Sequence, residues 1–136
     1  MAGPRDPGQP EPESGCVAKT SDHWGNSVVL GHDQWAHIRR FHPEMANRLK
    51  EICETVASPN LISESTIDPE ALIFDGYNRW GSSSRIIRVV VRYADRGKAE
   101  SGSAFGSIGT AYGPLTADTG NVGRVVYFAG LRRRTE

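Results

Sequence analysis

The chain of 136 residues is long enough to bury one core and too short for two domains of ordinary size. Its 16 Lys and Arg residues balance its 16 Asp and Glu residues, and this net charge of zero argues against a protein that binds nucleic acid over its whole surface. Any anion-binding site must therefore be local. No apolar run approaches the roughly 18 residues of a membrane span, no hydrophobic signal region opens the chain, and only two cysteines are present. We expect a soluble cytoplasmic protein.

The N-terminal region is rich in proline and poor in large apolar side chains. Residues 1–26 hold four of the eight prolines, and such a composition does not offset the entropy lost on ordering. We therefore expect a disordered tail over residues 1–26, an α+β domain over residues 27–130 and a basic C-terminal tail over residues 131–136.

Two helices are predicted after the tail. Asp33 is a suitable N-cap for a short helix that continues through residues 34–41. His42 precedes Pro43 and is pushed out of the helical conformation, whereas Pro43 suits the first turn of a second helix. This second helix has the strongest amphipathic pattern in the chain. Its apolar positions are Met45, Leu49, Ile52, Cys53 and Val56.

From residue 61 onward the apolar pattern changes to that of strands. The segments are joined by Gly, Ser, Asn and Asp turns with no helix between them, which favours antiparallel pairing. The sequence therefore predicts an α+β fold of two layers, in which two N-terminal helices pack on an antiparallel sheet of about four strands. The predicted strands cover residues 61–63, 71–74, 85–93, 105–112 and, less clearly, 124–130.

Two histidines flank the predicted helix break. His37 and His42 are five residues apart, so they lack the i, i+4 spacing of a helical zinc pair, and we expect no metal. At the start of the second helix, His42 would lie where unpaired N–H groups and the helix dipole favour an anion and a neutral, proton-accepting imidazole. His37 borders the apolar stripe of the first helix. The alternative is that both histidines have structural roles.

Strand alternation in residues 85–93 predicts a basic face. Ile87, Val89 and Val91 would face the helices, leaving Arg88 and Arg92 together on the open face. Residues 85–98 contain five basic side chains and one acidic side chain. Guanidinium groups form paired hydrogen bonds to phosphate oxygens, so this patch suits a phosphodiester. The alternative is an ordinary solvated outer face.

A third segment, SIGTAYG at residues 107–113, alternates in the same way. It would place Ile108, Thr110 and Tyr112 on one face, with the two hydroxyls on the open side near Arg88 if the strands are neighbours. Threonine and tyrosine are also ordinary strand formers, so this signal is weak by itself.

Two loop aromatics, Tyr77 and Trp80, could stack on bases. The alternative is that they cover an edge of the core. With Arg85 and Arg92 they complete the predicted substrate-binding set, which is Arg85, Arg92, Tyr77 and Trp80.

The motifs WAHIRRFHPE, SPNLI, RxxRVVV and TAY follow one another in this order between about residues 33 and 112. Together they resemble the phage-associated branch of the barnase/EndoU/colicin/RelE-like nuclease superfamily. The resemblance implies helices followed by an antiparallel sheet of about four strands, and a metal-independent ribonuclease that acts as a toxin or phage effector. The positions that it marks as catalytic are His37, His42, Arg88, Thr110 and Tyr112, with a less defined role for Glu44.

The function expected from these observations is an endoribonuclease without a metal or cofactor. His42 would accept the proton of a ribose 2′-hydroxyl, His37 or Tyr112 would protonate the leaving oxygen, and Arg88, with Arg85 or Arg92, would stabilise the phosphorane. RNA is the expected partner, together with a neutralising antitoxin or immunity protein, and no membrane partner is expected. The alternative is a non-catalytic module that binds RNA or an acidic protein through the same basic face.

Overall fold

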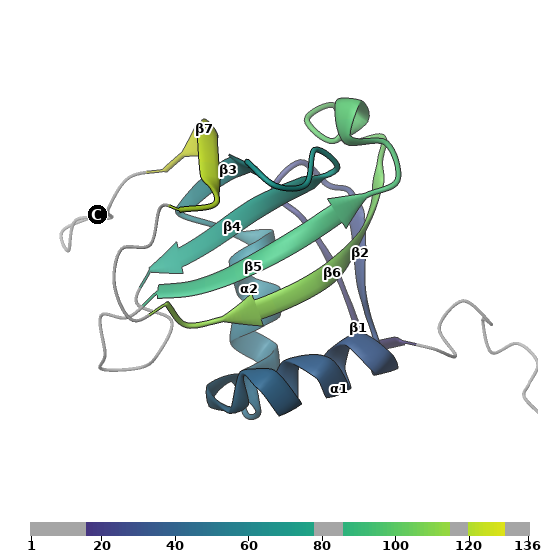
Figure 1. Cartoon of the computed structure of the whole chain (residues 1–136). Coiled ribbons are helices and arrows are strands. Elements are labelled where there is room, and N and C mark those ends of the chain that lie inside the picture. Colours follow the sequence, from purple (N-terminus) through teal and green to yellow (C-terminus); the bar gives the residue numbers. More distant parts are fainter. Residues whose placement is uncertain (1–15, 78–85, 115–119, 130–136) are drawn as a thin grey trace, which may run out of the picture.

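The computed structural model describes residues 16–77, 86–114 and 120–129 (Figure 1). Within these residues the chain forms seven strands, two α-helices and two short 3₁₀ turns. In chain order they are β1 (Cys16–Ser21), β2 (Ser27–Gly31), α1 (His32–Phe41), η2 (Pro43–Met45), α2 (Leu49–Ala57), β3 (Leu61–Ser65), β4 (Ala71–Tyr77), β5 (Ile86–Tyr93), η3 (Arg96–Lys98), β6 (Phe105–Tyr112) and β7 (Val122–Phe128).

All seven strands belong to one mixed sheet, with the order β1-β2-β6-β5-β4-β3-β7. Strands β3 to β6 form the expected antiparallel meander, but β2 pairs with β6 in parallel and β7 pairs with β3. The predicted fold of two N-terminal helices on a four-stranded antiparallel sheet is therefore wrong. A β-hairpin precedes the helices and extends the sheet beyond the meander.

That hairpin also changes the prediction for the N-terminal tail. Residues 16–26 form β1 and the turn into β2, so they are not part of a disordered tail. The turn is ordered by Asp22, whose buried carboxylate accepts hydrogen bonds from the backbone N–H groups of Trp24 and Asn26 and from the Tyr93 hydroxyl. Order in this segment thus comes from a buried polar network, which its proline content and its few large apolar side chains do not reveal. Residues 1–15 and 131–136 lie outside the described residues.

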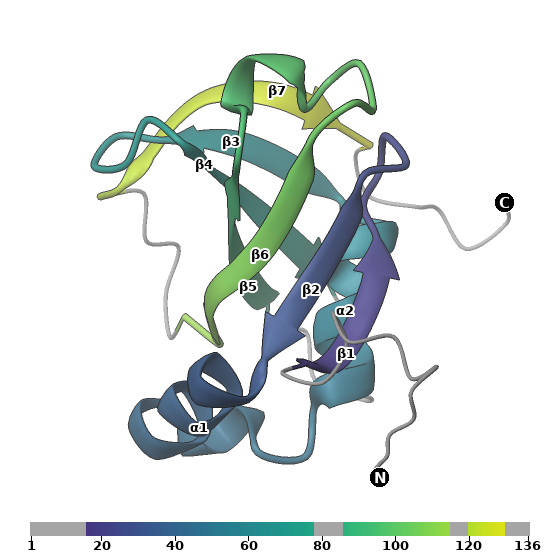
Figure 2. The ribbon, with the colours of Figure 1, turned by 90° about the vertical axis from the view of Figure 1, so that its right-hand side faces the viewer.

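The sheet is curved, and α2 packs on one face of it, which we call the inner face (Figures 1 and 2). Helix α1 lies across one end of the sheet, while η3 and β7 lie toward the other end. Burial of apolar surface between α2 and the inner face supplies most of the driving force for folding. The fully or nearly buried core side chains include Val28, Leu30, Ile38, Met45, Ile52, Val56, Ile62, Leu72, Phe74, Ile87, Val89, Val91, Ile108 and Ala111.

The helical segment differs from the prediction at its start and agrees with it in the core. Pro43–Met45 is a single 3₁₀ turn, and α2 begins only at Leu49. Met45, Ile52 and Val56 are nevertheless fully buried, as their spacing predicts. Gly31, not Asp33, is the N-cap of α1. Neither helix in the described residues has the length and apolar character needed to cross a membrane.

A β-bulge in β6 decides which of its side chains reach the outer face. Val90 lies opposite Thr110, whereas Val91 lies opposite Ile108, so Gly109 is the extra residue. Ile108 consequently turns into the core, and the prediction that it shares a face with Thr110 is wrong. Thr110 and Tyr112 keep the expected outward orientation, opposite the outer-face residues of β5.

The outer face contains a buried hydroxyl whose removal should stabilise the protein. Ser63 on β3 is 1% exposed, and its Oγ has no hydrogen-bond partner among the described residues. Ser63→Ala should raise the free energy of unfolding by about 1 kcal/mol, because it removes an unsatisfied buried polar group. Urea denaturation would measure the change.

Ser65 on the same strand provides the control for this prediction. Its Oγ accepts hydrogen bonds from the backbone N–H groups of Ile67 and Asp68. Ser65→Ala should therefore lower the free energy of unfolding. Equal destabilisation by Ser63→Ala and Ser65→Ala would contradict the unsatisfied state of the Ser63 hydroxyl.

Candidate functional site

Three of the predicted catalytic residues meet where β6 ends beside α1. The His42 imidazole stacks on the Tyr112 ring, with 5.2 Å between ring centroids and an interplanar angle of 27°. Tyr112 lies directly opposite Arg88 in the β5–β6 pairing, and the two side chains interact. Two carboxylates, Asp75 and Glu44, support the group. We call His42, Tyr112, Arg88, Asp75 and Glu44 the site cluster.

Arg88 is fixed by Asp75, its cross-strand neighbour on β4. Arg88 Nε donates to Asp75 Oδ1 at 2.8 Å and Nη2 donates to Oδ2 at 3.0 Å. Burial acts to lower the pKa of Arg88, but the hydrogen bonds and charge of Asp75, with those of Tyr112, outweigh it and raise this pKa. Arg88 is only 6% exposed. Arg88 therefore supports Tyr112 and is not available to bind a phosphate. This differs from its predicted role, which was to stabilise the phosphorane.

His42 is positioned by the end of α1. Its backbone N–H donates to Ile38 O at 2.7 Å, and its φ of −135° and ψ of 68° are the non-helical values that Pro43 demands. The predicted anion site at the start of a second helix is absent, because η2 is a single turn. A different feature orients the imidazole.

Glu44 faces the His42 ring. Its Oε2 lies 4.0 Å from His42 Nδ1 and accepts a hydrogen bond from the Gly113 N–H at 3.2 Å. The carboxylate is thereby tied to the end of β6, and it lies where it can stabilise positive charge on the imidazole once His42 accepts a proton. Both side chains remain about one-third exposed, at 32% for His42 and 31% for Glu44. The imidazole is therefore both oriented and accessible to a ligand.

The other predicted catalytic residues are not part of the site cluster. His37 is exposed on α1, where its ring contacts Phe41 at 4.7 Å between centroids. Thr110 is on the outer face, but its Oγ1 is buried and has no hydrogen-bond partner among the described residues. Among the described residues, no hydrogen bond or ring contact links either side chain to the His42–Tyr112 stack.

Of the predicted substrate-binding residues, only Tyr77 and Arg92 lie within the described part of the chain. Tyr77 lies beside the site cluster, and its pKa is raised by burial and by the charge of Asp75, although Arg88 acts in the opposite direction. Arg92 is exposed, and its Nε donates to Asp68 Oδ2 at 2.7 Å. Arg85 and Trp80 lie outside the described residues.

The basic patch expected on β5 is balanced by carboxylates. Arg88 pairs with Asp75, Arg92 pairs with Asp68, and Arg96 pairs with Glu100. A charge count over residues 85–98 could not detect most of these partners, because Asp68 and Asp75 come from the neighbouring β3–β4 segment. The outer face of the sheet is therefore not the open cationic surface that the sequence predicts.

Asp75 is the residue that sequence reasoning missed. It stands within ALIFDGY, a strand whose other residues through Gly76 are buried. A carboxylate inside a buried strand requires a partner, and this was the available signal in the sequence.

Among the described residues, no three His, Cys, Asp or Glu side chains converge in a way that could hold a metal ion.

Comparison of the chain with protein-family models, curated proteins and solved structures gives no significant match.

Proposed function

We propose that the protein is a metal-independent endoribonuclease whose reaction is internal attack by the ribose 2′-hydroxyl. The observation that carries the proposal is the stack of an accessible, carboxylate-oriented His42 on Tyr112, with Tyr112 held by the permanently charged Arg88. This arrangement places a proton acceptor beside a proton donor, which is what transfer of a phosphodiester bond to a neighbouring hydroxyl requires.

In the proposed reaction His42 is the base and Tyr112 is the acid. With Nδ1 turned to Glu44, His42 Nε2 takes the 2′-hydroxyl proton as the 2′-oxygen attacks phosphorus. The bond from phosphorus to the 5′-oxygen breaks, and the Tyr112 hydroxyl gives its proton to that oxygen. Because the neighbouring Arg88 guanidinium can only donate hydrogen bonds, the phenol proton is left for the leaving group. The products are a 2′,3′-cyclic phosphate and a free 5′-hydroxyl.

The structure favours Tyr112 over His37 as the acid, because the Tyr112 ring is stacked on His42 whereas His37 contacts Phe41. We also propose a different role for Arg88, which positions Tyr112 and does not contact the phosphate. The alternative, a non-catalytic module that binds RNA or an acidic protein through the sheet face, has less support because Arg88 and Arg92 are paired with carboxylates on that face.

Cellular role and compartment belong to the same proposal. Action as a toxin or phage effector, with a neutralising partner, is supported by the WAHIRRFHPE and TAY motifs alone, since the four-stranded fold that they imply is not the fold observed. We place the activity in the cytoplasm, where RNA is abundant. Cys53 is a free thiol, in keeping with a reducing compartment.

The proposed function predicts cleavage of RNA in EDTA and no cleavage of DNA. Purified full-length protein should cut a single-stranded oligoribonucleotide to products that end in a 2′,3′-cyclic phosphate. The same oligonucleotide in all-deoxy form should remain intact, because it lacks the internal nucleophile. Product termini can be identified by mass spectrometry. Intact RNA, or equal cleavage of both oligonucleotides, would overturn the proposal.

A further inference from the structure

Two arginines differ from all the others in the described part of the chain. Arg39 and Arg40, near the end of α1, have no carboxylate partner among the described residues. Their positive charges are therefore not balanced by a carboxylate and can bind an anion. The remaining described arginines, each with a carboxylate partner, are Arg48, Arg88, Arg92, Arg96 and Arg124.

Both arginines instead lie over aromatic rings. The Arg39 guanidinium is 5.6 Å from the Trp35 ring centroid, and the Arg40 guanidinium is 5.3 Å from that of Phe41. Cation–π contacts of this kind hold a guanidinium in place without cancelling its charge. Phe41 is 58% exposed and also contacts the His37 ring. A large apolar ring is thus kept at the surface between two groups that can be cationic.

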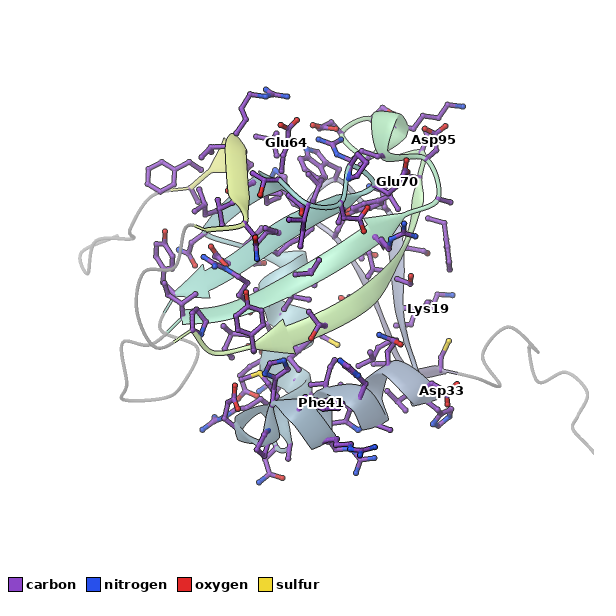
Figure 3. All side chains as sticks on the ribbon, in the orientation of Figure 1. Lys19, Asp33, Phe41, Glu64, Glu70 and Asp95 are labelled. Atoms are coloured by element: carbon purple, nitrogen blue, oxygen red, sulfur yellow. The ribbon has the colours of Figure 1, made fainter. Side chains whose placement is uncertain are left out.

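The face of α1 that carries His37 and Phe41 is turned toward the proposed active site. Gln34 Nε2 donates to Gly109 O on β6 at 2.6 Å, so the α1 face that carries Gln34 is turned to β6. His37 and Phe41 follow Gln34 at helical spacing and share that face. Phe41 is also the residue directly before His42. In Figure 3, Phe41 lies at the opposite end of the molecule from Glu64, Glu70 and Asp95, so that acidic group does not oppose an anion here.

We propose that Phe41, flanked by His37 and Arg40, is the stacking platform for one unpaired base of single-stranded RNA, with Arg40 facing its phosphates. This inference rests on the proposed function and specifies its substrate. An exposed ring accepts any base by stacking, and adjacent cations bind the backbone without reading the sequence. A base within a duplex cannot offer its face, so single-stranded RNA is preferred and sequence preference is weak.

Binding to RNA that cannot be cleaved tests the platform separately from catalysis. The probe is a fluorescent single-stranded oligoribonucleotide with 2′-O-methyl groups throughout, titrated with full-length protein and followed by anisotropy. Phe41→Ala should raise Kd about 5- to 140-fold, and Phe41→Trp should retain binding, because stacking is worth about 1–3 kcal/mol per base. Phe105→Ala, which removes a ring that is 51% exposed on another surface, is the matched control and should bind as the parent does.

The arginines have their own measurement in the same assay. Arg40→Gln should lower the dependence of log Kd on log salt concentration by about 0.7, the value for one phosphate contact to a single strand. Arg124→Gln, at an arginine already paired with Glu64, should leave the salt dependence unchanged.

Three results would overturn the platform. They are parental affinity in Phe41→Ala, equal affinity of the parent for single-stranded and duplex probes, and no binding of the single-stranded probe. Because the probe has no free 2′-hydroxyl, failure of the proposed catalysis would leave these binding results unaffected, so the two failures are distinguishable.

Discussion

His42→Ala should lower the rate of RNA cleavage by about 10²–10⁴-fold while leaving the fold intact. The size of the loss is that typical of a positioned general base. The fold should survive because the side chain is 32% exposed and its described contacts are limited to the Tyr112 ring and the Glu44 carboxylate. Single-turnover cleavage of an RNA oligonucleotide in EDTA would give the rate, and circular dichroism would report the fold.

Two further variants make the His42 result specific. Tyr112→Phe keeps the ring on which His42 stacks but removes the hydroxyl, so it should lower kcat and leave the binding of uncleavable RNA unchanged. His32→Ala removes another exposed histidine, at the first residue of α1, and should cleave as the parent does. Parental cleavage by His42→Ala would remove this residue from the mechanism and leave the stack on Tyr112 without a catalytic role.

Local periodicity predicted the core well. The alternation in β5 put Ile87, Val89 and Val91 on the inner face, and helical spacing identified Ile52 and Val56; all of them are buried. These patterns are reliable because burial of one face imposes a period on a short stretch of chain. The same reasoning identified the outward orientation of Tyr112, which the site cluster requires.

Features that depend on distant partners were not predictable in this way. The hairpin of β1 and β2 adds Val28 and Leu30 to the core, but its place in the sheet depends on the pairing of β2 with β6 and on the buried hydrogen bond from the Tyr93 hydroxyl to Asp22. The bulge at Gly109 shifts the alternation of β6 by one residue, and no local sequence pattern predicts it. Local sequence patterns therefore do not determine the register of these strands or their pairing with distant segments.

The same limit explains the most serious error at the site. The strand pattern placed Arg88 on the outer face correctly, and its charge then suggested an exposed phosphate ligand. Only the β4–β5 register reveals Asp75 opposite it. A buried cation with a dedicated partner is a rigid support, so the cationic surface for RNA must be sought elsewhere, on α1.

Asp75→Asn should lower the free energy of unfolding by about 3–5 kcal/mol, the cost of leaving one member of a buried ion pair without its partner. Asn keeps the shape of the side chain but loses the charge that compensates Arg88, and both residues are almost fully inaccessible, at 2% and 6% exposure. This is a large part of the 5–15 kcal/mol by which domains of this size are usually stable. Urea denaturation would measure it.

The second outer-face pair supplies the control, since Asp68→Asn makes the same chemical change beside the exposed Arg92 and should have little effect on stability.

If Asp75→Asn is too unstable to purify, the double variant Asp75→Leu/Arg88→Met should recover most of the stability, because it removes both charges together. That folded variant leaves Tyr112 without the neighbouring Arg88 guanidinium, so kcat should fall while KM stays near the parental value. Parental kcat in the double variant would show that Arg88 supports the sheet alone and has no part in positioning Tyr112.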